Sequence, residues 1–337
     1  MRKFLVNILS ALLVIALFYF LGKEFFSNWG EIRSFTFQFN VLNLLAASIL
    51  YIAAFIFLSF GWHLILRCLH HQIPFSHVFL YFFITLPSKY IPGKIWMVVT
   101  RMKFCKAHNV PHSITLLSTG IEGVFEILAG SYISLVALLQ MQIFGKFSVV
   151  GIAAINAIGL LLLSPRIFYF IINIYLKIVK LEPICKGGRL SFIKLLILQI
   201  IYIIGMLGIG LSQMFFLLAL TPIKYQYLPF IASIGAFSYI VSIIAFFAPG
   251  GIGVRESIWY LALKSITTSS VALIYAFASR LWMIIIEVLL LFISLLALWI
   301  RKRRCDDSLS DQLGRPAFSP SIHKKNKSAG VKREISD

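Results

Sequence analysis

Two Pro-Gly breaks interrupt long apolar stretches, and they decide the fold that the sequence predicts. The first lies in YIPGKIWM at residues 90–97, and the second lies in APGGIGVRE at residues 248–256. Proline lacks a backbone N–H and clashes with the preceding helical turn, so Pro92 and Pro249 should each break a helix. Inside a membrane, a broken helix is tolerated only where it packs within protein or lines a cavity. Two breaks at corresponding positions of two halves therefore predict a binding site of the kind found in transporters.

The composition indicates a polytopic membrane protein. Of the 337 residues, 60% are hydrophobic and only 13% are charged, whereas about a quarter of the residues in a soluble domain are charged. The net charge of +19 is compatible with nucleic-acid binding, but the lysines and arginines gather in loops and in the tail, as the positive-inside rule predicts for cytoplasmic segments. We therefore expect a multi-pass protein of the cytoplasmic (inner or plasma) membrane, with both termini cytoplasmic and no nucleic-acid partner.

Hydropathy predicts an all-α bundle of about six to eight spans. Full spans are expected at residues 4–22, 41–66, 113–140, 147–164, 192–220 and 270–300. Residues 78–86 are too short to cross alone, so residues 78–106 should form a re-entrant hairpin around the first break. Residues 228–268 form either a second such hairpin or two full spans, and residues 167–178 form either an interfacial helix or an additional short span.

The loop charges predict two inverted repeats within the membrane domain, residues 1–300. Residues 41–140 and residues 192–300 each follow the order span, broken hairpin, span, and the basic loops give them opposite orientations. The remaining residues 301–337 are polar, Ser-rich and basic, so we expect a disordered cytoplasmic tail.

The breaks also predict an anion site. A half-helix that starts after a break presents free N–H groups and the positive end of the helix dipole, which attract a phosphate. The predicted head-group phosphate-binding residues are Lys89, Gly93, Lys94, Arg101, Gly250, Gly251 and Arg255. The alternative is that these cations only extend their charged ends to the membrane interface.

Further charged residues lie in apolar segments and should face the bundle interior. They are Glu122, Glu126, Glu256, Arg280 and Glu287. Glu122 and Glu126 share one helix face because they are four residues apart. These groups either neutralise buried arginines and hold the two hairpins, or carry a coupled proton. The cysteine and histidine spacing fits no zinc signature, so we expect no metal or other cofactor.

These residues resemble, in order, the motifs of a known family, the lysylphosphatidylglycerol synthase transmembrane region, also called the flippase-like domain family. The resemblance lies in PGKIW at residues 92–96 with Arg101, Glu122 with Glu126, PGGIGVRE at residues 249–256, and Arg280. It covers residues 1–300, and the second Pro-Gly stretch is its specific part. The resemblance implies a lipid or glycolipid translocator. It does not imply lipid aminoacylation, because a polar tail follows residue 300 where multi-domain members carry a soluble aminoacyltransferase domain.

Two positions depart from the family pattern. Trp96 stands where many members have glycine, which affects the expected substrate cavity. Gly123 stands where an arginine often follows the glutamate, so the expected Glu-Arg pair of the family is in doubt.

We therefore expect a non-enzymatic translocator that moves an anionic phospholipid or a lipid-linked sugar between leaflets, in envelope lipid or glycolipid biogenesis. Its partners would be that lipid, the bilayer and proteins of envelope biosynthesis. Two alternatives stay open. One is a membrane glycosyltransferase or lipid-modifying enzyme that uses a polyprenyl-phosphate donor. The other is a non-transporting scaffold of an envelope-polymer assembly.

Overall fold

The computed structural model describes most of the chain between residues 39 and 312. The described stretches are 39–91, 95–140, 164–178, 191–245 and 248–312, with short pieces between 23 and 34, between 150 and 161, and at 180. These residues contain helices and no strand. The predicted span at residues 4–22 lies outside them, and so does most of the span at residues 147–164. The chain divides into two units, Met1–Leu295 and Leu296–Asp337.

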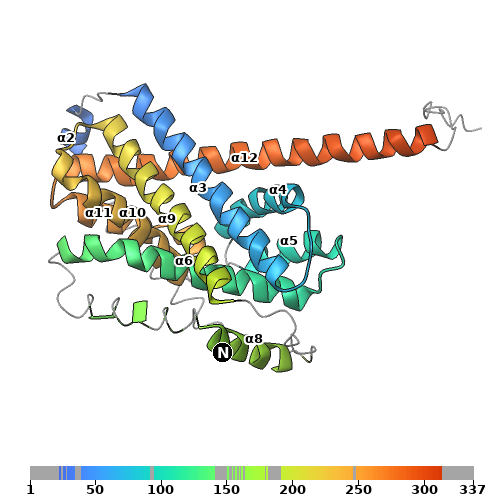
Figure 1. Ribbon diagram of the computed structural model, residues 1–337. Coiled ribbons are helices and arrows are strands. Elements are labelled where there is room, and N and C mark those ends of the chain that lie inside the picture. Colours follow the sequence, from blue (N-terminus) through green and yellow to red (C-terminus); the bar gives the residue numbers. More distant parts are fainter. Residues whose placement is uncertain are drawn as a thin grey trace, which may run out of the picture. The chain divides into compact units, whose positions relative to one another are not determined.

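Five helices of the described residues are long and apolar enough to cross a membrane (Figure 1). They are α3 (Val41–Cys68), α6 (His112–Gln140), α9 (Phe192–Leu220), α10 (Leu228–Ile244) with its preceding turn η4 (Tyr225–Tyr227), and α12 (Ser269–Gln312). The shorter elements are α2 (Trp29–Ser34), α4 (Phe75–Thr85), η1 (Leu86–Tyr90), α5 (Ile95–Lys106), α8 (Pro165–Ile178), η5 (Pro249–Gly251) and α11 (Val254–Leu263). The prediction of an all-α membrane bundle is confirmed.

Three of the helices beside the breaks are too short to cross a bilayer. The helix α4 has 11 residues, α5 has 12 and α11 has 10. At 1.5 Å per residue they extend about 15–18 Å, against a hydrocarbon core of about 30 Å. A full span at residues 254–268 is thereby excluded, so the second break joins one long and one short arm. The 14 residues of α8 extend only about 21 Å, which favours the interfacial helix.

The first helices of the two predicted repeats, α3 and α9, pack antiparallel along their length. The Asn40 N–H at the start of α3 donates to the Ala219 carbonyl at the end of α9 over 3.0 Å. Further along, Leu58 lies so close to Gly205 that an added Cβ would be 2.7 Å from Leu58 Cδ2. Inverted repeats require this antiparallel arrangement, although the repeats themselves stay a prediction.

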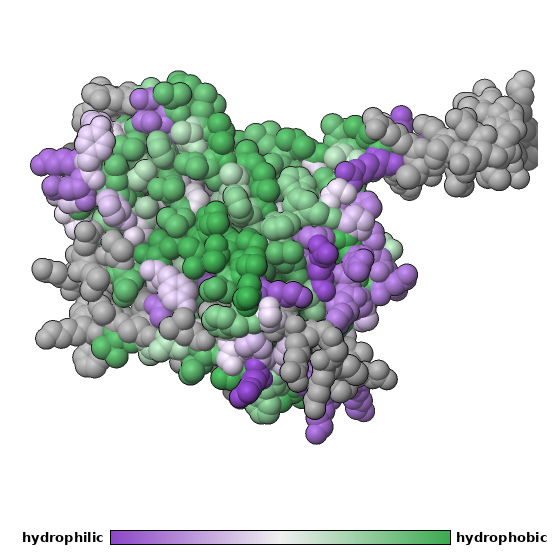
Figure 2. Space-filling model, viewed as in Figure 1, coloured by the Kyte–Doolittle hydropathy of each residue, from purple (hydrophilic) through white to green (hydrophobic). Residues whose placement is uncertain are grey.

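Apolar side chains cover the outer surface of these two helices. Figure 2 shows hydrophobic residues over the region where α3 and α9 lie, and hydrophilic residues toward the ends. The exposed positions include Ile49 on α3 and Ile200, Ile204 and Leu207 on α9. An exposed apolar surface of this extent suits contact with lipid chains rather than water.

The helix α12 extends beyond the predicted membrane boundary. It remains helical to Gln312, and the disordered cytoplasmic tail expected over residues 301–337 stays a prediction. The helix can continue because this stretch contains no glycine or proline before Gly314 and Pro316. In the second unit, the Arg303 guanidinium lies 3.9 Å from the ring centroid of Trp299. Residues 313–337 lie outside the described part of the chain.

A glycine contact joins α9 to α10. A Cβ at Gly210 would collide with the carbonyl oxygen of Ala232, and a Cβ at Gly235 would lie 2.8 Å from the Cα of Gly210. Backbone cannot move aside as a flexible side chain can. Because glycine has no Cβ, Gly210 and Gly235 let the two helices approach closely, as small residues do at membrane helix interfaces.

Gly210→Ala should lower the thermal stability of the purified protein. The added methyl group meets rigid backbone, and such overpacking costs about 1–3 kcal/mol. The matched control is Gly120→Ala on α6, where nothing lies within 4 Å of the added Cβ. Melting curves in detergent should show a lower midpoint for the first variant and an unchanged or slightly higher midpoint for the control. Equal midpoints would contradict the close contact.

Candidate functional site

The turn η1, which precedes the first break in the sequence, meets the second break in the interior of the first unit. Tyr90, the last residue of η1, packs against Gly250 of η5 so closely that a Cβ at Gly250 would collide with the tyrosine ring. Gly250 also has φ 58° and ψ 14°, a left-handed conformation that glycine adopts without steric cost. Gly251 and Gly253 have positive φ as well. The second break is therefore built from glycines that permit both the turn and the approach of Tyr90.

Part of the first break cannot be compared with the prediction. Pro92, Gly93 and Lys94 lie outside the described residues, and so does the side chain of Pro249. The chain is described up to Ile91 and again from Ile95. The roles predicted for these residues stay predictions.

Among the described residues, the interior around the breaks holds four cations and four carboxylates. The cations are Lys89, Arg101, Arg255 and Arg280, and the carboxylates are Glu122, Glu126, Glu256 and Glu287. All of them are buried except Lys89, whose side chain is 19% exposed. The four glutamates and Arg280 therefore lie inside the bundle, where the sequence analysis expected them.

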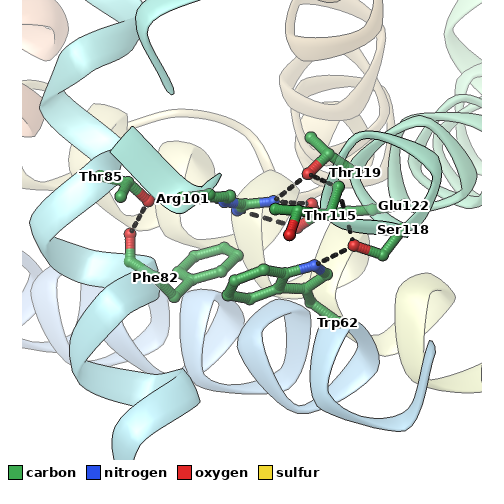
Figure 3. A network of polar contacts seen from close by, with 8 residues as sticks. All are labelled: Trp62, Phe82, Thr85, Arg101, Thr115, Ser118, Thr119 and Glu122. Atoms are coloured by element: carbon green, nitrogen blue, oxygen red, sulfur yellow. Dashed lines mark hydrogen bonds and ion pairs between the residues drawn. The ribbon is translucent and has the colours of Figure 1, made fainter. Parts of the chain in front are cut away.

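Arg101 and Glu122 form the first ion pair, between α5 and α6 (Figure 3). Arg101 Nη1 contacts one carboxylate oxygen, and Nη2 donates to the other over 3.3 Å. The guanidinium also lies 4.2 Å from the ring centroid of Trp62 and 5.1 Å from that of Phe82. Gly123 stands where an arginine often follows the glutamate in the family, but Glu122 pairs with Arg101 of another helix. The sequence could not show this pairing.

The second ion pair joins η1 to α12. Lys89 Nζ lies 2.7 Å from Glu287 Oε1. The Tyr51 hydroxyl on α3 donates to the same oxygen over 2.6 Å. Glu287 thus connects three elements, and Lys89 is engaged in the interior rather than extended to the interface.

The third ion pair joins α12 to the second break. Arg280 Nε lies 3.4 Å from Glu256 Oε1, and Arg280 Nη2 donates to the Gly250 carbonyl over 2.6 Å. Arg280 and Glu287 both lie on α12. Each pairs with a residue of a different predicted hairpin, Glu287 with Lys89 and Arg280 with Glu256.

A cavity of about 220 Å³ lies between the hairpins. Its polar lining includes Lys89, Arg101, Glu122, Glu126, Tyr239 and Arg255. Tyr239 and the neighbouring Met97 were not predicted, since neither is charged nor part of a break. Trp96 does not line this cavity and is 52% exposed.

Two ionisable side chains on the cavity wall have no hydrogen-bond or ion-pair partner among the described residues. Arg255 is 3% exposed, and its Nε and Nη2 atoms make no hydrogen bond there. Its guanidinium lies 5.6 Å from the ring centroid of Tyr239. Glu126 is 9% exposed, and the same part of the chain places no cation within 4 Å of its carboxylate. These two groups are available to a ligand.

The described residues hold no group of three or more His, Cys, Asp or Glu side chains that could bind a metal ion. The free cysteines that the structure describes, Cys68 and Cys105, therefore belong to no such group. The polar groups described in the site are therefore mainly the three ion pairs, together with Arg255 and Glu126.

Glu122→Gln should destabilise the protein strongly. It leaves the buried Arg101 guanidinium without its counter-ion, which typically costs about 3–5 kcal/mol. Replacing both partners, as Arg101→Met with Glu122→Leu, should recover most of that loss. Glu126→Gln is the matched control on the same helix face, because no described residue loses a partner. Melting curves of the four proteins test this, and equal midpoints for the two glutamine variants would contradict it.

The family comparison agrees with this architecture. The family model described as the lysylphosphatidylglycerol synthase TM region matches residues 7–291, which include both breaks and all eight interior charges. A comparison with curated proteins found no match. The family indicates a lipid-related role in a membrane, and the apolar helices agree with a multi-pass protein. The chain therefore belongs to the family of the lysylphosphatidylglycerol synthase transmembrane region.

Proposed function

We propose that this protein translocates a lipid with a phosphate-bearing head group, an anionic phospholipid or a lipid-linked sugar, between the leaflets of the cytoplasmic membrane. The observation that carries the proposal is Arg255, a buried guanidinium on the cavity wall with two nitrogens that have no described partner. A buried charge without a partner is costly. A phosphate would supply the missing counter-ion and accept both hydrogen bonds.

The position of Arg255 supports the same ligand. It is the second residue of α11, which begins at Val254 directly after the glycine turn. The N-terminus of a helix carries the positive end of its dipole and favours phosphate. Lys89 and Arg101 also line the cavity and are cations, but each already has a carboxylate partner. We therefore assign the phosphate contact to Arg255.

The size of the cavity supports head-group binding rather than enclosure of a whole lipid. Its volume of about 220 Å³ is below the range of about 300–1,000 Å³ that is usual for pockets enclosing drug-sized ligands. The acyl chains would stay in the bilayer beside the apolar outer surface while the head group crosses.

We propose transport rather than catalysis. Three of the four interior carboxylates, Glu122, Glu256 and Glu287, are held by cations. These pairs attach the broken hairpins to neighbouring helices and so support a structural role. We further propose that the repeats are inverted, with both chain termini cytoplasmic, because alternating access around a central site uses such a pair of repeats.

Arg255→Gln should reduce lipid movement at least about tenfold, because a charge-assisted contact to phosphate is lost. The assay uses the full chain in liposomes with acyl-chain-labelled phosphatidylglycerol and a labelled polyprenyl-phosphate sugar, and dithionite bleaches the outer leaflet. The matched control is Arg67→Gln, at the exposed end of α3. The melting temperature of Arg255→Gln should not fall, because Nε and Nη2 of Arg255 have no described hydrogen-bond partner.

Unchanged movement in Arg255→Gln would reject Arg255 as the phosphate contact. If folded wild-type protein moved neither lipid, translocation itself would be contradicted. The lipid-movement assay and the melting curve use the same protein preparation. The melting curve therefore distinguishes a variant that has lost its fold from one that has lost only its function.

A further inference from the structure

Among the described residues, Glu126 is the one interior carboxyl group outside an ion pair. Glu122, Glu256 and Glu287 each pair with a cation. Glu126 lies on α6, is 9% exposed and lines the cavity between the hairpins. Burial disfavours the charged form of a carboxyl group unless a cation or hydrogen bonds stabilise that form. The side chain of Glu126 is therefore placed to take up and release a proton.

The other ionisable groups around Glu126 leave one cation to balance its charge. Lys89, Arg101 and Glu122 already belong to ion pairs, and tyrosines are uncharged near neutral pH. Arg255 lines the same cavity and belongs to no ion pair among the described residues. The described charged and titratable groups that surround Glu126 are Glu122 on α6 itself, Lys89 on η1, Arg101 on α5, Tyr202 on α9, Tyr239 on α10 and Arg255 on α11.

A phosphate bound at Arg255 would change the electrostatics at Glu126 in two ways. It would occupy the guanidinium that otherwise balances the carboxylate across the cavity. It would also add a second negative charge to a space of low dielectric constant, where like charges repel strongly. Both effects favour the protonated form of a carboxyl group. Entry of the head group is thereby linked to proton uptake by Glu126.

We infer that Glu126 is the proton-binding residue of the cavity, and that one proton crosses the membrane with each monoanionic phosphodiester head group. The empty cavity would hold the Arg255 cation and the Glu126 carboxylate. The loaded cavity would hold the same cation, the phosphate and a neutral Glu126. These groups sum to zero charge in both states, so the lipid anion and the proton cross as a neutral pair. The inference rests on the proposed function, whose phosphate contact it keeps, and adds an energy source to it.

A pH gradient across liposomes tests the inference. Full-length wild-type protein is reconstituted with acyl-chain-labelled phosphatidylglycerol, whose phosphodiester stays anionic near neutral pH. Valinomycin with equal potassium on both sides holds the voltage at zero. If a proton crosses with each lipid, the lipid should concentrate in the leaflet on the alkaline side, up to about tenfold for a gradient of one pH unit. Dithionite bleaching of the outer leaflet measures the distribution.

Glu126→Gln should lose this response to pH, because an amide neither takes up nor releases a proton near neutral pH. The lipid should still move, since the neutral amide resembles the protonated carboxyl group and the phosphate contact at Arg255 remains. Under the pH gradient it should distribute equally between the leaflets. A voltage imposed without a pH gradient should displace lipid in this variant but not in wild-type protein, because the anion then crosses without its proton. Glu126→Asp keeps a carboxyl group and should keep the response to pH.

A pH-sensitive dye in the liposome lumen gives a second measurement. In wild-type protein, protons and labelled lipids should cross in equal number. Arg255→Gln should stop both movements, because proton uptake by Glu126 depends on a phosphate at Arg255. Proton movement without lipid movement in that variant would contradict the link between the two groups. Glu126→Gln takes no partner from any described residue, so its melting curve should match that of wild-type protein.

Lipid that moves in wild-type protein without following the pH gradient would overturn the inference and leave the proposed function intact. A response to the gradient that survives in Glu126→Gln would also overturn it, because another group would then carry the proton. Loss of all lipid movement in folded Glu126→Gln would have the same consequence, since a neutral side chain there should still let the lipid cross. If folded wild-type protein moved no lipid, the proposed function would fail, and the inference with it.

Discussion

The rest of the structure depends on one constraint, that a charge inside an apolar bundle needs a partner. Each of the three interior ion pairs joins different elements, namely α5 to α6, η1 to α12, and α12 to α11. The short helices α5 and α11 cannot cross a membrane alone, and their free ends expose backbone groups. Ion pairs to neighbouring helices hold them at depth. The three ion pairs thus link the elements beside the breaks to their neighbours in the first unit.

The same constraint applies to the backbone at the second break. A turn inside a bundle leaves carbonyl groups without helical partners, and these must be satisfied within protein. Arg280 serves both needs, because it donates to the Gly250 carbonyl over 2.6 Å and approaches Glu256. Gly250 in turn must be glycine, because its φ is positive and Tyr90 packs on it. Backbone geometry and electrostatics are therefore coupled at one point.

The sequence predicted the long apolar spans, the two breaks and the burial of the four glutamates, because those features depend on local composition. It did not predict which charges pair. Glu256 follows Arg255 directly, yet adjacent residues point about 100° apart on a helix, so Glu256 meets Arg280 while Arg255 faces the cavity. Lys89 and Glu287 are 198 positions apart. Such pairings are set by tertiary packing, which hydropathy and spacing do not encode.

The two unpartnered groups argue for function because the other six charged groups of the described interior each belong to an ion pair. A bundle under selection for stability alone would replace Arg255 and Glu126 by apolar side chains, which is often neutral or stabilising at buried ionic sites. Retaining both groups on one cavity fits the proposed binding site, because stability is often lost where activity is gained. A translocator must also release what it binds. In the proposed function, Arg255 would be paired only while a head group occupies the cavity, which would provide recognition without a permanent contact.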